Sequence, residues 1–432
     1  MGVRFGSKTT TGWRATIAVA MSNYIEAGSI IAIATSLGLW QDRFGLDDLA
    51  VGLLAALSAN AFGAAAGAAI GGPLCDRYGR KFIYTYDLLL YMLGVLIAVF
   101  ATSFGMLLTA FVLTGIAVGA GVTASWTYIA EEAPPDRRAA HVGAAQLAWS
   151  IGPTLGYLLA VVVAPLGLLG SRLIFLHLFV VAAVTWWVRR GLAESTVWRN
   201  RTAESGQVTF AGSLRGLFTR RTNLLAMLFL FGVYALWNGV AGQAGIFQPR
   251  MYEAVGLTSA TEQYLLQVLV WGCTSAATYF GFMLLADRVS RRWLYCAGAA
   301  LGVLAWAALI YAPAGTATLL FFAVGWGVSS GIGAQAFYGL WASELFATRY
   351  RASAQGVLFL AARVLVGLLS VGFPALLTQI GLRGLGTLIL GLLLGSLLIG
   401  TVWVPRTQGK SLEQIERERY GSGTTGGAVV AP

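Results

Sequence analysis

The stretch "LCDRYGRK" (residues 74–81) interrupts a long apolar run with four charged side chains. It returns in altered form as "LADRVSRR" at residues 285–292, so that Asp76 matches Asp287, 211 positions later. Membrane topology alone accounts for basic residues beside apolar segments, but Asp and Glu contribute little to it. The matched acids therefore favour a duplication over two unrelated loops.

A second pair of segments repeats at almost the same interval. "EEAPPDRR" (131–138) returns as "ELFATRYR" (344–351), which matches Glu131 with Glu344, 213 positions later. Each motif follows the equivalent apolar run of its half. A hydrophobic chain with duplicated halves is typical of secondary transporters, whose substrate site lies between the halves near the bilayer midplane.

The composition indicates a membrane protein. Of the 432 residues, 57% are hydrophobic and only 11% are charged, whereas a soluble protein carries about 25% charged residues. The net charge of +11 comes from short clusters between apolar runs, which argues against nucleic acid as a partner. The three cysteines show no metal-ligand spacing, and no glycine-rich run carries the lysine of a nucleotide-binding loop. We therefore expect no metal, no cofactor and no enzyme activity.

The apolar runs predict the membrane-spanning segments. A helix needs about 20 mainly apolar residues to cross the hydrocarbon, and a lone strand could not satisfy its backbone there. We therefore expect an all-α membrane protein with twelve transmembrane helices, at residues 14–39, 49–73, 83–102, 106–130, 142–165, 173–189, 222–248, 263–285, 293–312, 316–342, 353–379 and 384–403.

Basic residues predict the orientation of these spans. With the N-terminus inside, 24 of the 29 Lys and Arg residues lie on the inner side and four lie in outer loops, while Arg363 lies within a span. Both termini are therefore expected in the cytoplasm, with the chain in the plasma (inner) membrane. The expected domains are an N-terminal six-helix half (1–189), a cytoplasmic linker (190–221), a C-terminal six-helix half (222–404) and a tail (405–432) whose end is disordered.

These motifs resemble those of the major facilitator superfamily. The segment 74–81 resembles the signature loop of that family. "YIAEEAPPDRR", "SELFATRYR" and "VPRTQGKSLEQIE" resemble motifs of its sugar porters and of their relatives that carry organic ions. The resemblance implies two pseudo-symmetric six-helix halves and a cytoplasmic gate of ion pairs between them. The implied gate residues are Asp76, Arg77, Arg80, Glu131, Arg138, Asp287, Arg288, Glu344 and Arg351.

Glu26 is the candidate for proton coupling. An ionisable residue inside a span is a functional candidate because its burial in lipid is costly, and Glu26 lies about 18 Å along a helix from Arg14. In the sugar porters that the chain resembles, an acid near this place carries protons and pairs with an Arg of the fourth span. Phe111 stands at that Arg position, which puts coupling by that pair in doubt. A hydrogen bond in helix packing is the alternative role of Glu26.

Arg363 lies about as deep in the eleventh span. At this position the chain resembles organic-anion and aromatic-acid transporters, whereas sugar porters usually carry a tryptophan. A buried guanidinium stays charged and requires a partner. Three partners remain open: Glu26, a carboxylate of the substrate, or a structural contact with a backbone carbonyl or another acid.

Polar and aromatic side chains of the spans are candidates for substrate binding. Gln146 resembles the sugar-contacting Gln of the fifth span, and its amide offers donors and an acceptor to a hydroxyl-rich ligand. Asn238 and Gln243 lie in the seventh span, where the family's Gln pair is missing. Rings that could stack on a substrate are Trp126, Trp149, Trp237 and Trp271, of which Trp149 and Trp237 are the main candidates.

The sequence therefore predicts a monomeric secondary transporter that works by alternating access. The favoured function is proton-coupled uptake of a small polar solute such as a sugar, polyol or sugar acid. Arg363 keeps open a proton symporter of organic anions or aromatic acids, and the same fold serves exporters of drugs or metabolites. A membrane receptor that binds without flux is the alternative from another class.

Overall fold

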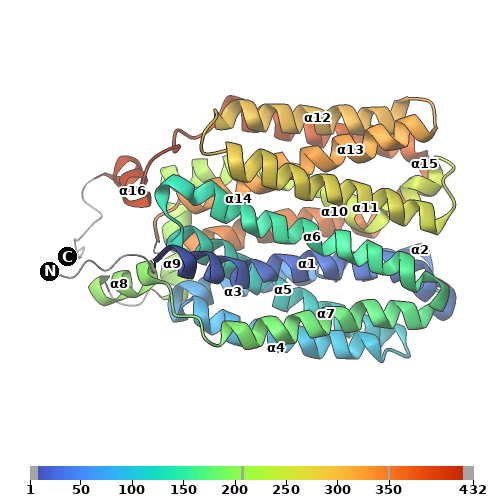
Figure 1. Cartoon of the computed structure of the whole chain (residues 1–432), viewed down its shortest axis with the longest axis horizontal. Coiled ribbons are helices and arrows are strands. Elements are labelled where there is room, and N and C mark those ends of the chain that lie inside the picture. The colour runs from blue at the N-terminus through green and yellow to red at the C-terminus, as the bar shows by residue number, and fades with distance from the viewer. Residues whose placement is uncertain (1–7, 206–208, 349–350, 422–432) are drawn as a thin grey trace.

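The computed structural model describes residues 8–205, 209–348 and 351–421, and within these ranges it contains helices but no strands. Long helices run side by side along one axis (Figure 1). They are α1 (Lys8–Phe44), α2 (Asp48–Ala56), α3 (Phe62–Tyr78), α4 (Arg80–Val99), α5 (Phe104–Glu132), α6 (Arg138–Val163), α7 (Leu168–Arg189), α10 (Arg221–Ala254), α11 (Ala260–Ala276), α12 (Arg291–Tyr311), α13 (Thr316–Ile332), α14 (Ala334–Glu344) and α15 (Arg351–Val402).

Three short helices lie at one end of this bundle (Figure 1). They are α8 (Thr196–Ser205), α9 (Phe210–Thr219) and α16 (Leu412–Tyr420). We call this the charged end and the other the opposite end. Helices α8 and α9 lie in the expected linker and α16 in the expected tail, whereas most of the stretch expected to be disordered (422–432) falls outside the described residues.

Ten helices of the described chain are long and apolar enough to cross a membrane. One of them, α15, has 52 residues and contains a break at Gly381, where φ is 67° and ψ is 174°. Glycine suits this break because it has no Cβ to oppose a positive φ. The expected second span (49–73) is divided between α2 and α3. When α15 is counted as two crossings and α2 with α3 as one, the total agrees with the predicted twelve.

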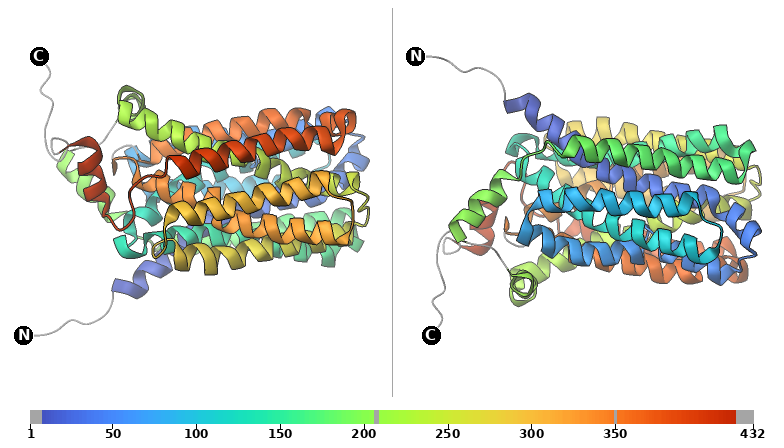
Figure 2. Two further views of the ribbon diagram at one scale, coloured as in Figure 1. Left: turned by 90° about the horizontal axis from the view of Figure 1, so that it is seen from above. Right: turned by 90° about the horizontal axis from the view of Figure 1, so that it is seen from below.

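The helices form two bundles. In the N-terminal bundle, α1 packs on α6 and α7, while α3 and α4 pack on α5; in the C-terminal bundle, α10 packs on α15, and α13 on α11 and α12. Contacts of α3 with α15 and of α6 with α11 join the two bundles. Figure 2 shows the C-terminal bundle toward the viewer on the left and the N-terminal bundle on the right. The interface between them is where a transporter places its substrate site.

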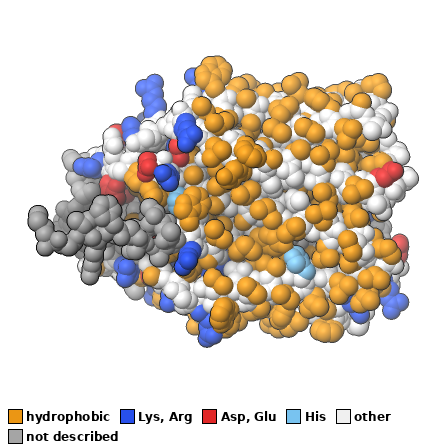
Figure 3. Space-filling model, in the orientation of Figure 1, with side chains coloured by type: hydrophobic (Ala, Val, Ile, Leu, Met, Phe, Trp, Pro, Cys, Tyr) orange, Lys and Arg blue, Asp and Glu red, His pale blue; other side chains and the backbone are white. Residues whose placement is uncertain are grey.

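Apolar side chains cover the flank of the molecule that Figure 3 shows, whereas Lys and Arg gather mainly toward the charged end. Large side chains that a soluble protein would bury are exposed on the outer surface, such as Trp187 at 71% and Leu228 at 67%. A surface of this kind is solvated by lipid tails. The fold is therefore that of an integral membrane protein, as the composition predicts.

Helices α3 and α5 approach so closely that only glycine fits between them. A Cβ at Gly119 would lie 2.0 Å from the carbonyl oxygen of Ala64, and one at Gly67 would lie 2.0 Å from that of Ile116. Small residues allow such backbone contact in membranes, where packing rather than the hydrophobic effect drives helix association. We call this contact the glycine seam; it consists of Gly63, Gly67, Gly115 and Gly119.

The seam predicts that Gly119→Ala destabilises the protein. The added methyl group meets main-chain atoms that cannot rotate away, and overpacking of this kind lowers the free energy of unfolding by about 1–3 kcal/mol. We expect a clearly lower thermal midpoint in detergent. Gly391→Ala is the matched control, since no atom lies within 4 Å of its Cβ position. Equal midpoints for the two variants would contradict the tight packing.

Candidate functional site

The first charge cluster, Asp76, Arg80 and Glu131, joins α3, α4 and α5 at the charged end. Arg80 Nη2 lies 2.6 Å from Glu131 Oε1, and Arg80 Nη1 lies 3.7 Å from Asp76 Oδ1. All three residues are buried. Two residues of the C-terminal bundle complete the cluster. Arg351 Nη1 lies 3.4 Å from Glu131 Oε1, and Ser353 donates its main-chain N–H and its hydroxyl to Asp76 Oδ2 at 2.8 and 2.7 Å.

The second charge cluster, Asp287, Arg291 and Glu344, has the same design in the C-terminal bundle. Arg291 Nη1 lies 3.0 Å from Glu344 Oε2, and Arg291 Nη2 lies 3.1 Å from Asp287 Oδ1. Here the additions come from the N-terminal bundle. Arg138 Nη1 lies 3.2 Å from Glu344 Oε1, and the main-chain N–H of Ala139 donates to Asp287 Oδ2 at 3.1 Å.

The two clusters are related by the sequence repeat. In each cluster, two acids and one Arg come from the same bundle. The other bundle adds an Arg, which binds one of the acids, and a main-chain N–H, which donates to the other acid. Both additions come from the first turn of a helix. A helix N-terminus favours a carboxylate through its partial positive charge. Removal of one partner from a buried ion pair costs about 3–5 kcal/mol. These four contacts between bundles therefore hold the charged end closed in this structure.

The gate residues expected from the sequence fall into two groups. Arg77 and Arg288 are exposed, and neither forms an ion pair with any residue that the structure describes. Arg77 instead lies over the ring of Tyr78, 4.9 Å from its centroid. The other seven belong to the two clusters. Arg291 is not among the expected residues, although it matches Arg80 in the repeat, and strict use of that correspondence would have identified it.

The linker after α7 contacts the first charge cluster. Ser195 donates its hydroxyl to Glu131 Oε2 at 2.6 Å. Glu194 accepts the main-chain N–H groups of Arg80 and Lys81 at 2.9 Å each, so its carboxylate caps the first turn of α4. Sequence reasoning missed both residues because polar side chains are ordinary in a linker.

The tail contacts the second charge cluster in a similar way. Arg291 donates to the hydroxyl of Thr407 at 3.2 Å, and Arg138 donates to the main-chain carbonyl of Lys410 at 3.2 Å. Hydrogen bonding to the main chain at the start of α16, with the positive charge of Arg138 nearby, lowers the pKa of Glu413. The tail therefore lies across both bundles at the charged end.

Glu26 and Arg363 form a buried ion pair in the middle of the molecule. Glu26 lies on α1, and its Oε1 accepts from Nη2 of Arg363 on α15. Arg363 Nη1 also donates to the main-chain oxygen of Asn60, between α2 and α3, at 2.9 Å. The guanidinium lies over the ring of Phe359, 4.5 Å from its centroid. Of the three partners left open for Arg363, the structure has two, Glu26 and a main-chain carbonyl, that of Asn60. Both contacts join the two bundles.

A small cavity lies beside this pair. Its volume is about 10 Å³, which is room for about one water molecule. Trp149, Asn238 and Arg363, all expected from the sequence, line it together with Asn60 and Trp271. Asn60 is an addition. A polar side chain within the apolar run 49–73 is the signal that could have identified it.

Buried polar atoms around the cavity lack hydrogen-bond partners within the described part of the chain. They are Nε1 of Trp271 and Oδ1 of Asn238, whereas Nε1 of Trp149 interacts with the carboxylate of Glu26. An unpaired buried polar group costs about 1–3 kcal/mol. The cavity therefore offers an indole donor and an amide acceptor that a bound molecule can satisfy.

Three other residues expected to bind substrate do not line the cavity. Gln146 donates to a main-chain carbonyl of α13 at 3.3 Å, and Gln243 donates to a main-chain carbonyl of α15 at 3.0 Å. Trp237 stacks on Trp326 with ring centroids 6.0 Å apart. All three are buried, and in this state their partners are other parts of the protein.

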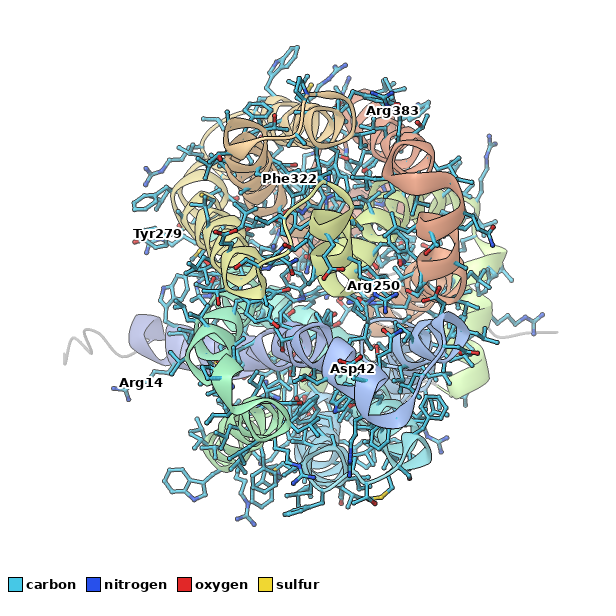
Figure 4. The ribbon with its side chains drawn as sticks, turned by 90° about the vertical axis from the view of Figure 1, so that its right-hand side faces the viewer. Arg14, Asp42, Arg250, Tyr279, Phe322 and Arg383 are labelled. Atoms are coloured by element: carbon cyan, nitrogen blue, oxygen red, sulfur yellow. The ribbon has the colours of Figure 1, made fainter. Side chains whose placement is uncertain are left out.

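A vestibule of about 690 Å³ lies at the opposite end, lined by α1, α10, α11 and α15. Figure 4 views this end of the molecule and labels Asp42 of α1 and Arg250 of α10, which both line the vestibule. Arg250 Nη2 donates to Gln41 Oε1 at 2.5 Å, and Arg250 Nη1 lies 3.4 Å from Asp48 Oδ1. These contacts join the end of α10 to the N-terminal bundle beside the vestibule.

Only a thin layer of side chains separates the vestibule from the central cavity. Ile31 of α1 and Gly245 of α10 line the cavity, whereas Ala34 of α1 and Ile246 of α10 line the vestibule. These positions are less than one helical turn apart. The vestibule therefore approaches the cavity from the opposite end, whereas the charged end is closed.

Comparisons with known proteins agree with this architecture. Residues 14–282 match the family model described as Major Facilitator Superfamily, and residues 194–418 match the one described as Sugar (and other) transporter. The minor myo-inositol transporter IolF of Bacillus subtilis (strain 168) is 43% identical over 413 residues, or 94% of each chain. A quinate permease of Emericella nidulans is 25% identical over 94% of this chain and 88% of its own length.

Solved structures share the fold. The proton:xylose symporter XylE bound to 6-bromo-6-deoxy-D-glucose matches with a TM-score of 0.81, at 18% identity, over 95% of this chain and 100% of that one. The inward-open conformation of XylE from E. coli gives a TM-score of 0.68 at the same identity and coverage. The human organic anion transporter MFSD10 gives 0.69 at 15% identity, over 90% of this chain and 99% of that one.

The charge clusters predict that Ser353→Ala opens the charged end. The variant loses one hydrogen bond to a charged carboxylate, which is worth about 1.5–3 kcal/mol, so the open population should rise roughly tenfold or more. Spin labels at Tyr78→Cys and Val289→Cys, both exposed at this end, report the distance between bundles once the three native cysteines are replaced by serine.

The control for this experiment is Thr109→Val. The hydroxyl of Thr109 is exposed and bonds only to Gly105 of its own helix, within the described residues. We expect its distance distribution to match that of the unmodified protein. The role of Ser353 in closure is refuted if the Ser353→Ala distribution is unchanged as well.

Proposed function

This chain belongs to the major facilitator superfamily and, within it, to the sugar (and other) transporter family; on that premise, we propose that it takes up a neutral polyhydroxylated solute, of the cyclic polyol class, together with protons. The family assignment makes it a membrane transporter and not an enzyme. The 43% identity to a protein named as a myo-inositol transporter, over nearly the full length of both chains, supports the substrate class.

The observation that carries the proposal is the set of unpaired polar atoms around the central cavity. The indole N–H group of Trp271 and the amide oxygen of Asn238 have no partner among the described residues. Each hydroxyl of a polyol both donates and accepts, so such a ligand can satisfy donors and acceptors alike. The indole rings of Trp149 and Trp271, 5.2 Å apart between centroids, also offer apolar faces to the ring carbons.

The central ion pair favours a neutral cargo. Glu26 and Arg363 neutralise each other, and Arg363 is also bound by Asn60. Once the cavity of about 10 Å³ has widened, a neutral solute can occupy it without breaking this ion pair. An anionic solute that bound Arg363 would leave the carboxylate of Glu26 buried without its counter-charge, which is strongly unfavourable.

We assign proton coupling to the Glu26–Arg363 pair. A proton on Glu26 removes its charge and weakens its hold on Arg363, which is a contact between the two bundles. Phe111 replaces the Arg that serves sugar porters within the N-terminal bundle, and here the guanidinium comes from the C-terminal bundle. Protonation is thereby linked directly to the contact that alternating access must break.

We place the charged end in the cytoplasm, with the chain in the plasma membrane, because 24 of its 29 basic residues lie on the inner side under that orientation. The vestibule then faces outward, as uptake requires. In this scheme the two charge clusters are the inner gate, and their release follows binding of solute and proton. A monomer suffices, since the path runs between two bundles of one chain.

Arg363 supports a second candidate cargo, a hydroxylated carboxylate. Once Glu26 is protonated, the guanidinium is free to bind a carboxylate in its place. The 25% identity to a quinate permease over most of both chains is consistent with this cargo. A solute of this kind would carry its own counter-charge into the cavity and would use the same unpaired polar atoms.

The coupling assignment predicts the behaviour of Glu26→Gln combined with Arg363→Met. The single Glu26→Gln change leaves a buried guanidinium unpaired, at a cost of about 3–5 kcal/mol, whereas the double variant removes both charges. We expect the double variant to lose accumulation driven by a pH gradient and to keep counterflow exchange of myo-inositol in proteoliposomes. Glu262→Gln, an exposed acid on α11, is the control. Retained pH-driven accumulation in the double variant would remove the pair from the coupling mechanism.

The cavity predicts which solute stabilises the protein. Ligand at 100 times its Kd adds about 2.7 kcal/mol to the stability of the state that it binds. We expect myo-inositol to raise the thermal midpoint of the purified protein and quinate to leave it unchanged. Asn238→Leu should abolish the shift, whereas Asn200→Leu, at an exposed position on α8, should preserve it. A shift with quinate and none with myo-inositol would reverse the choice between the two candidates.

A further inference from the structure

Four aromatic side chains form a cluster at the interface between bundles, which we call the aromatic plug. Trp126 on α5 belongs to the N-terminal bundle, and Tyr234 on α10, Tyr338 on α14 and Phe359 on α15 belong to the C-terminal bundle. The rings of Tyr234 and Tyr338 stack with centroids 4.0 Å apart. Trp126 meets Tyr338 at 5.4 Å and Phe359 at 5.9 Å, each in a T-shaped arrangement. The ring of Trp126 therefore contacts the three rings of the C-terminal bundle, and these contacts close the interface between the bundles at this level.

The aromatic plug lies between the central ion pair and the first charge cluster. The ring of Phe359 packs against the guanidinium of Arg363. Along α15, Arg351, Gln355, Phe359 and Arg363 follow one another at intervals of four residues and so share one face of the helix. This face of α15 extends about 18 Å from the central cavity to the charged end. A solute that leaves the central cavity toward the charged end must pass this face of α15.

Polar atoms of this region are buried without partners. The hydroxyls of Tyr234 and Tyr338 and both amide atoms of Gln355 make no hydrogen bond within the described ranges, and all three residues are at most 1% exposed. A buried polar group without a hydrogen-bond partner destabilises the state in which it is buried. Phenylalanine and leucine would fill much the same space without that cost. Closure of the interface therefore does not explain why these residues are polar.

We propose that Tyr234, Tyr338 and Gln355 form a second binding station for the same neutral polyhydroxylated solute, occupied when the charged end is open. This proposal rests on the proposed function, because it assumes that such a solute crosses the protein. It adds a site that is distinct from the cavity beside Trp149 and Asn238. The polar atoms that lack partners in the closed state are the ones that hold the solute in the open state.

Opening of the charged end exposes this station. The N-terminal bundle moves away from the C-terminal bundle, so Trp126 withdraws from the three rings that it contacts. The phenol hydroxyls and the amide then border the path. Each hydroxyl donates and accepts, and the amide adds two donors and an acceptor. None of these groups is charged, so the station suits a hydroxyl-rich neutral solute better than an anion.

The test compares the two sides of the membrane. Exchange of radiolabelled myo-inositol is measured in right-side-out and inside-out membrane vesicles, for the unmodified protein, Tyr338→Phe and Gln355→Leu. Loss of one neutral hydrogen bond is worth about 0.5–1.5 kcal/mol, so we expect the KM from the charged end to rise roughly three- to tenfold in each variant. The KM from the opposite end should stay unchanged, because the solute there meets the central cavity first.

Tyr157→Phe is the matched control. Tyr157 lies on α6, is fully buried and has a hydroxyl without a partner in the described chain, yet it lies outside the aromatic plug. Its removal should leave both KM values unchanged. Equal KM values from the charged end for Tyr338→Phe, Gln355→Leu and the unmodified protein overturn the second station, as does an equal rise in Tyr157→Phe. Absence of myo-inositol exchange in the unmodified protein overturns the proposed function itself, and the station with it.

Discussion

A charge buried at membrane depth must find its counter-charge inside the protein, because lipid supplies none. In this chain that constraint is met repeatedly by a partner from the other bundle. Glu26 of α1 binds Arg363 of α15, Glu131 binds Arg351, and Arg138 binds Glu344. Within the described residues, Arg138, Arg351 and Arg363 therefore have a carboxylate partner only when the halves are together, whereas Glu131 and Glu344 each also bind an Arg of their own bundle. The same interactions that make the fold possible in lipid make its interface sensitive to any event that changes a charge.

The sequence was sufficient to predict the general plan of the fold. Apolar runs and basic loops predicted twelve spans, and the repeat of the "DR" segments predicted two related halves. The interruption between α2 and α3 was not foreseen, because the run 49–73 is uniformly apolar apart from Ser58 and Asn60. Asn60 is needed in that turn by its tertiary contacts: its amide donates to Gly242 of the other bundle at 2.9 Å, and its main chain accepts from Arg363. Local sequence carries no signal for such distant partners.

For the site, the sequence pattern could predict candidate residues, whereas only the packed structure shows their partners. Arg363 and Glu26 were recognisable as ionisable residues within spans, but 337 positions separate them, and three partners were equally consistent with the sequence. The sequence around the exposed Arg288 and the buried Arg291 does not show which of the two is buried. Only the repeat, in which Arg291 matches Arg80, distinguishes them. Gln146 was a candidate because it resembles the sugar-contacting Gln of the fifth span, and Gln243 because it lies in the seventh span, where the family's Gln pair is missing. In this state both bind main-chain carbonyls, which the sequence cannot indicate.

The glycine seam has a consequence for how the halves can move. Backbone packs directly on backbone there, as between Gly119 and Ala64, so no side-chain rotamers are available to absorb a displacement. An interior without such compliance transmits strain rather than relaxing it. A displacement of α5 at Trp126 is therefore expected to displace Glu131, near the end of the same helix, by a similar amount. The N-terminal bundle is thus expected to move as one rigid unit, so that in the proposed function a proton on Glu26 or a bound hydroxyl group displaces the whole charged end.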